Sequence, residues 1–73
     1  MICRSIRVVS PQGAVQLIEG NDLQIWRANE AARFVDIHDL ALPLQRDGHN
    51  RVIAQVPTSW LLIPHWVADD ESR

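Results

Sequence analysis

The chain lacks several features that define whole classes of protein. It has 73 residues and a single cysteine, Cys3, which excludes a scaffold built on disulfides. Its longest apolar-rich run covers residues 60–67 and is interrupted by Pro64 and His65, whereas a membrane-spanning helix needs about 20 residues. Residues 1–7 contain no apolar stretch of the length found in a signal peptide. We therefore expect a cytoplasmic protein that does not enter a membrane and keeps Cys3 as a free thiol.

Lysine and tyrosine are absent, and all seven basic residues are arginine. The acidic residues include a cluster in the last five positions, so residues 1–68 balance six arginines against six acidic residues. A body without net charge exerts no long-range attraction on a polyanion, which disfavours nucleic-acid binding. A chain of this length buries about three-fifths of its surface, enough for one thin core. We expect one compact domain over residues 1–68, followed by a short acidic tail over residues 69–73.

The sequence contains no spacing that is typical of a catalytic or metal site. There is no C-x-x-C, H-x-x-x-H or H-E-x-x-H motif, and each of the three glycines stands alone at a predicted turn, unlike a phosphate-binding loop. The residues with suitable donor atoms are scattered over separate segments: Cys3, Asp36, His38, Asp39, His49 and His65. We therefore predict a protein that is not an enzyme and that holds neither a cofactor nor a metal ion.

The first 27 residues are predicted to form a three-stranded meander. β-Branched residues indicate a strand over about 2–9, in which Ile2, Ile6 and Val8 share one face. Residues 10–13 have the proline and glycine positions of a type I turn. A second strand follows over about 14–19, a turn over residues 20–22, and a short third strand that ends near Arg27.

Residues 29–38 favour a short helix. Asn29 is a good N-cap, the next residues are strong helix formers, and four side chains recur on one helical face: Ala31, Phe34, Val35 and His38. His38 is then a hydrogen-bonded residue of that face, whereas Asp36 and Asp39 lie on the solvated side. A strand is the competing interpretation, because apolar and polar residues alternate over 35–38. We prefer the helix.

Alternating apolar residues on either side of Asp47-Gly48 predict a β-hairpin around Gly48. Its strands cover about residues 40–45 and 51–56. A three-residue loop over 46–48 opposes Leu42 to Val52 and Leu40 to Ala54, which keeps the apolar rows on one face. The same loop places Gly48 in the left-handed region, so we predict a positive φ for Gly48.

The C-terminal residues 57–68 are expected to be irregular, because Pro57 closes a strand and Pro64 interrupts any helix. Not every apolar side chain of residues 60–67 can face inward in a regular element. We expect Trp60 to belong mainly to the core and Trp66 to be at least partly exposed, in a two-tryptophan patch rimmed by Asp69 and Asp70. The fold class is thus α+β, a small domain with more strand than helix.

These features favour a small regulatory or inhibitory module that binds a protein partner, or a second copy of itself, by occupying its surface. Tryptophan and arginine are enriched at interface hot spots, and the candidate partner-binding residues are Trp26, Arg27, Trp60, Leu61, Trp66 and Val67. The alternative is a nucleic-acid-binding regulator that uses Arg4, Arg7, Arg27 and Trp26 on the first sheet. Convergence of these arginines on one face would favour that alternative.

Overall fold

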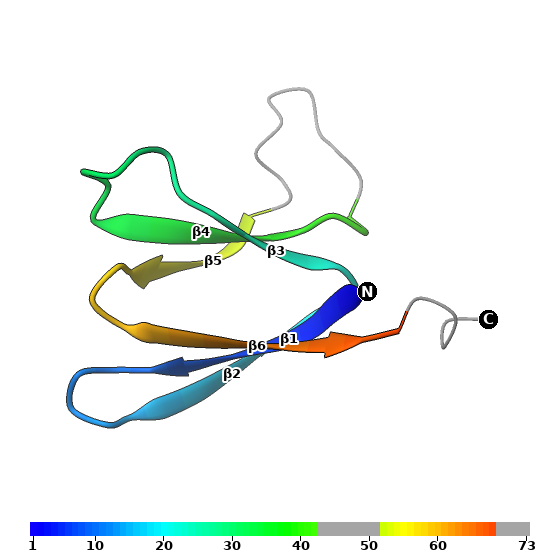
Figure 1. The fold of residues 1–73 in the computed structure, drawn as a ribbon, viewed down its shortest axis with the longest axis horizontal. Coiled ribbons are helices and arrows are strands. Elements are labelled where there is room, and N and C mark those ends of the chain that lie inside the picture. The colour runs from blue at the N-terminus through cyan, green and yellow to red at the C-terminus, as the bar shows by residue number, and fades with distance from the viewer. Residues whose placement is uncertain (43–51, 69–73) are drawn as a thin grey trace.

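The computed structural model describes residues 1–42 and 52–68, which form six strands in two three-stranded antiparallel sheets (Figure 1). The strands are β1 (Ile2–Val9), β2 (Val15–Glu19), β3 (Leu23–Trp26), β4 (Phe34–Asp39), β5 (Val52–Pro57) and β6 (Leu61–Val67). The first sheet has the order β2-β1-β6 and the second the order β3-β4-β5. The described segments contain no helix, and hence none that is long and apolar enough to cross a membrane.

The β1–β2 hairpin confirms the first predicted turn and both of its strands. The Gly13 N–H donates to the Ser10 carbonyl at 2.9 Å, and the Ala14 N–H donates to the Ser10 hydroxyl oxygen at 3.0 Å. Gly13 has a φ of 90°, a conformation that glycine adopts without steric penalty. Val9 and Val15 then pair across the two strands.

A bulge in β1 decides which of its side chains face the core. Cys3 pairs with Trp66 and Ser5 with His65, so Arg4 is an extra residue between the two pairs. Of the three residues predicted to share one face, Ile6 and Val8, which follow the bulge, are buried together. Before it, Cys3 takes the buried position and Ile2 is half-buried beside Val67.

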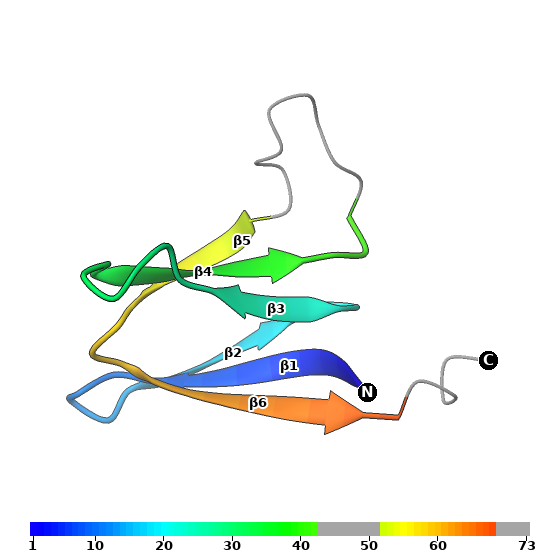
Figure 2. The same ribbon diagram turned by 45° about the horizontal axis from the view of Figure 1, so that its top comes forward.

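The core lies between the two sheets. Its buried apolar residues are Cys3, Ile6, Val8, Leu23, Val35, Ile37 and Val56, with Ile18, Ala54, Trp60 and Leu62 packed against them. In Figure 2, β3 of the second sheet lies beside β1 of the first, and the two strands are in contact. One thin core therefore holds the sheets together, as expected for a chain of this size.

The predicted helix over residues 29–38 is wrong, because this segment forms one turn and then β4. Asn29 does cap the turn: its side-chain oxygen accepts a hydrogen bond from the Ala31 N–H at 2.9 Å, and its carbonyl accepts one from Ala32 at 3.2 Å. The chain then extends, with Val35 and Ile37 buried on one face. A ten-residue helix is marginal on its own, and pairing with strands on both sides gives β4 more support. The α+β class is therefore replaced by two sheets in the described part.

The predicted three-stranded meander is also wrong, because β3 pairs with β4 and not with β2. The chain crosses from one sheet to the other at residues 20–22. The buried Asp39 carboxylate accepts hydrogen bonds from the backbone N–H groups of Asn21 and Asp22, both at 3.2 Å. It also accepts one from Ala41 at 3.1 Å. Asp39 thus fixes this crossing, contrary to its predicted place on a solvated helix face.

Of the two strands predicted to flank Gly48, the described residues contain only the second, as β5. Gly48, its predicted φ and the predicted strand residues from 43 onward lie outside the described residues. Leu40 and Leu42 do not oppose Ala54 and Val52, because residues 40–42 form a turn and a bend after β4. The partner of β5 is β4 itself, with Ile37 opposite Ala54.

The predicted irregular C-terminal segment is a regular strand in its last part. Residues 57–60 form a turn in which the Trp60 N–H donates to the Pro57 carbonyl at 3.0 Å. β6 then pairs with β1 over its whole length, including Pro64 opposite Ile6. Proline has no backbone N–H to donate to a neighbouring strand. Because β6 is an edge strand with only one neighbour, the sheet tolerates Pro64 there.

Asp39→Asn should destabilise the fold by about 2–4 kcal/mol, because the amide nitrogen then faces a backbone N–H and leaves buried donors unsatisfied. Urea denaturation measures the change. Asp36→Asn is the matched control on the same strand: Asp36 is half-buried and accepts one hydrogen bond, from the Gln55 side chain at 2.9 Å. That variant should change the stability by less than about 1 kcal/mol. Equal effects of the two variants would contradict the role assigned to Asp39.

Candidate functional site

The solvent-facing side of the first sheet, here the outer face, carries an exposed set of apolar side chains. The strand register places its residues in three rows across β2, β1 and β6: Val15, Val9 and Leu61; Leu17, Arg7 and Ile63; Glu19, Ser5 and His65. Leu17 is 57% exposed, Leu61 58% and Ile63 43%. Contiguous exposed apolar side chains make this face the candidate interaction surface of the described residues.

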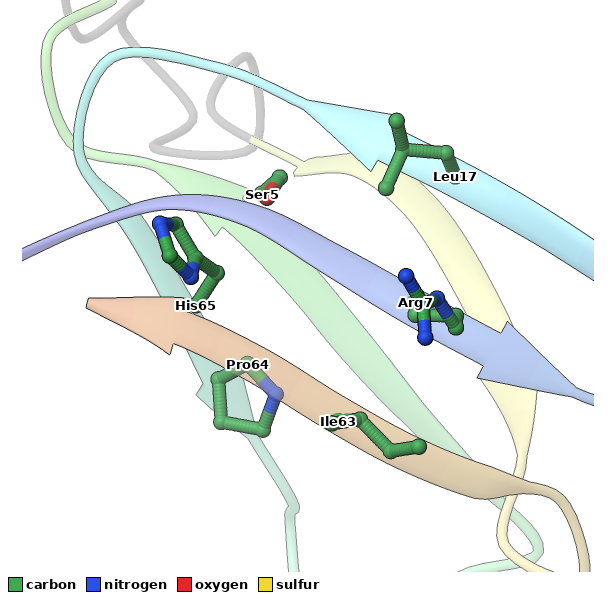
Figure 3. Close-up of a pocket in the computed structure, with 6 residues that line it drawn as sticks. All are labelled: Ser5, Arg7, Leu17, Ile63, Pro64 and His65. Atoms are coloured by element: carbon green, nitrogen blue, oxygen red, sulfur yellow. The ribbon is translucent and has the colours of Figure 1, made fainter.

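Arg7 lies at the centre of the outer face. Figure 3 shows its side chain on β1, between Leu17 of β2 and Ile63 of β6. These three residues line a hollow of about 370 Å³ together with Ser5, Pro64 and His65. Within the part of the chain that the structure describes, Arg7 makes no hydrogen bond and no ion pair.

A second, more apolar hollow opens between the sheets at the opposite face of β6. It has a volume of about 230 Å³ and is lined by Cys3, Leu23, Gln24, Ile25, Pro64 and Trp66. The Cys3 side chain is only 1% exposed, and its thiol donates to the Ser5 carbonyl at 3.3 Å. Trp66, which pairs with Cys3 and is 51% exposed, lines the same hollow.

The structure does not gather the six predicted partner-binding residues on one surface. Leu61 is exposed on the outer face and Val67 is half-buried beside Ile2, whereas Trp66 lies on the opposite face of β6. Trp26 lies in β3, on the other sheet, and Arg27 follows it.

The two-tryptophan patch is not formed. Trp60 packs against the core before β6 begins, and Trp66 lies near the end of that strand. Six residues of extended chain separate them by about 20 Å. The expected exposure of Trp66 is confirmed, and Asp69 and Asp70 lie outside the described residues.

The arginines proposed for nucleic acid do not converge. The Arg4 side chain donates to Asn21 at 3.4 Å, beside the crossing between the sheets. Arg27 donates to the carbonyls of Asn29 and Glu30, so it braces its own turn. Of these three arginines, only Arg7 belongs to the outer face, and a lone arginine does not follow a nucleic-acid backbone.

The potential metal ligands also stay apart: residues 1–42 and 52–68 contain no group of three or more histidine, cysteine, aspartate or glutamate side chains placed to hold a metal ion. His38 lies in β4 with its ring 6.0 Å from that of Trp26, in an edge-to-face arrangement. Its buried Nε2 has no hydrogen-bond partner among residues 1–42 and 52–68, where a hydrogen-bonded histidine was predicted. His49 lies outside the described residues.

Sequence reasoning missed most of the outer face. Leu17, Ile63 and His65 were not singled out as binding residues, and Arg7 was considered only for nucleic acid. The signal was present in the parity of the strands: Arg7 alternates with the core residues Ile6 and Val8. To recognise the outer face from this parity, one would also have to know that β1 pairs with β6, although the two strands come from opposite ends of the chain.

Comparison of the chain with models of protein families, with curated proteins and with solved structures finds no match.

Trp66→Ala should leave the fold largely intact and accelerate the reaction of Cys3 with a thiol reagent. Removing the indole opens the wall of the second hollow, and reactivity follows exposure of the sulfur. The measurement is the rate of reaction with an aromatic disulfide under native conditions. Trp26→Ala, which removes a tryptophan of similar exposure from the other sheet, should leave this rate unchanged. An unchanged rate in Trp66→Ala would show that this side chain does not shield the thiol.

Proposed function

We propose that this protein is a small, non-enzymatic module that binds a protein partner through the outer face and regulates or inhibits it by occupying its surface. The observation that carries the proposal is the exposed apolar set around Arg7: Leu17, Ile63 and Leu61 are exposed beside a guanidinium that has no partner among the described residues. A reducing compartment such as the cytoplasm suits the free thiol of Cys3.

The composition of the outer face is that of a protein interface. Interface centres are depleted in charge and enriched in apolar groups and arginine. Its centre has a single charge, Arg7, with aliphatic neighbours on both sides, and its polar residues Glu19, Ser5 and His65 form one margin. Burying the aliphatic side chains against a partner is favourable by about 25 cal/mol per Å² of apolar area.

Nucleic-acid binding is a weaker proposal for the same chain. It needs several cations along one path and flat aromatic rings beside them. Arg4 and Arg27 are each engaged with their own turns. Trp26, the ring predicted to stack on bases, is on the other sheet, and Trp66 lies on the opposite face of β6. The outer face offers aliphatic side chains, on which bases do not stack.

Leu17→Thr combined with Ile63→Thr should abolish capture of the partner from nuclease-treated native lysate. Threonine keeps the strand propensity, so the change removes apolar contact while the sheet is retained. The loss of two aliphatic contacts should weaken binding about tenfold or more. Mass spectrometry of the captured proteins, quantified against the wild type, measures the effect.

Phe34→Thr is the matched control, because it removes an equally exposed apolar side chain from the second sheet. This variant should capture the partner as the wild type does. Capture that survives the double substitution, or that disappears on nuclease treatment of the wild-type sample, would contradict the proposal.

A further inference from the structure

We propose that the hollow around Arg7 binds a carboxylate side chain of the partner, with aliphatic groups on either side of that carboxylate resting on Leu17 and Ile63. This inference rests on the proposed function and names the chemistry that the partner presents. It starts from the Arg7 guanidinium, which has no partner among residues 1–42 and 52–68 and whose planar fork of donors fits the two oxygens of a carboxylate.

The other polar groups of the hollow also suit an acceptor. The Ser5 hydroxyl and the His65 ring line the same hollow as Arg7 and come from paired positions on β1 and β6. In Figure 3 the His65 ring lies beside Ser5, on the same side of the sheet as the Arg7 side chain. A ligand oxygen held by Arg7 therefore has two further polar groups within the same hollow.

The aliphatic neighbours determine how strong such a contact becomes. An exposed arginine–carboxylate pair contributes little, because water screens it. When a partner covers Leu17 and Ile63, water leaves the hollow and the local dielectric constant falls, which strengthens the pair. The apolar contact and the ion pair thus depend on each other.

The charge of the outer face favours a carboxylate over a phosphate. Among the described residues Arg7 is its only arginine, and Glu19 lies on the same face two residues beyond Leu17. A single guanidinium balances a singly charged carboxylate. A doubly charged phosphate would be only half compensated and would be repelled by Glu19.

The test uses three synthetic peptides that differ at one position: Ser-Val-Ser-Glu-Ser-Val-Ser and its versions with glutamine or phosphoserine at the centre. Each is titrated to millimolar concentration into the full ¹⁵N-labelled chain, and the amide shifts of Arg7, Leu17 and Ile63 give the affinity. The glutamate peptide should bind about tenfold more tightly than the glutamine peptide.

Arg7→Gln should remove this preference for glutamate. Arg33→Gln, which removes the same charge from an exposed position outside the outer face, should keep it. Equal binding of the glutamate and glutamine peptides, tighter binding of the phosphoserine peptide, or no shift with any peptide would overturn the carboxylate site.

The same variants separate this inference from the proposed function. If lysate capture is lost in the Leu17→Thr, Ile63→Thr protein but unchanged in Arg7→Gln, the outer face binds a protein and the carboxylate site is wrong. If neither change affects capture, the proposed function itself is wrong. Loss of capture in both, with the glutamate preference abolished in Arg7→Gln, supports both.

Discussion

The fold depends on the Asp39 carboxylate, which holds the chain where it passes from one sheet to the other. The carboxylate is buried and accepts the N–H groups of Asn21 and Asp22, so the turn between β2 and β3 is fixed from the end of β4. Gly20 makes room for this contact, since a Cβ there would lie 2.9 Å from the Asp39 carboxylate and 2.4 Å from a methyl carbon of Leu23. Because β3 begins at Leu23, the same contact sets where β3 enters the second sheet and which of its residues reach the core.

A thin sandwich leaves its outer surfaces uncovered. The inner rows of the two sheets bury Ile6 and Val8 of β1, whereas Leu17, Leu61 and Ile63 on the other side of the first sheet stay exposed. The bulge at Arg4 changes the parity of β1, so that Cys3 faces the core while Ser5 and Arg7 face outward. Without the extra residue, the side chains before and after this point could not both occupy their present faces. The bulge at Arg4 thus places Cys3 in the lining of the second hollow and Arg7 at the centre of the outer face.

The sequence was sufficient for elements whose signals are local. β1, β2, β3 and the turn at Gly13 were predicted because alternation and turn residues act within a few positions. We predicted a three-residue hairpin loop that ends in a glycine of positive φ for residues 46–48. Residues 11–13 form a loop of this kind, which ends in Gly13. The errors have a common cause: β4 was assigned as a helix, and Pro64 was expected to end regular structure. In both, pairing with a distant strand outweighed local propensity. The outer face was missed for the same reason, because its rows join residues from both ends of the chain.

Arg7 gives the outer face a selectivity that aliphatic residues alone would not provide. A sheet face of leucine, isoleucine and valine attracts any apolar surface, including other unfolded or folded chains. A surface that covers Arg7 without supplying an acceptor buries an unpaired charge, and the penalty offsets the gain from Leu17 and Ile63. A surface that supplies one carboxylate avoids this penalty and gains a charge-assisted hydrogen bond in a site from which water has been displaced. In the proposed interface, the central arginine would let the apolar residues contribute to binding while it restricts the surfaces to which they bind.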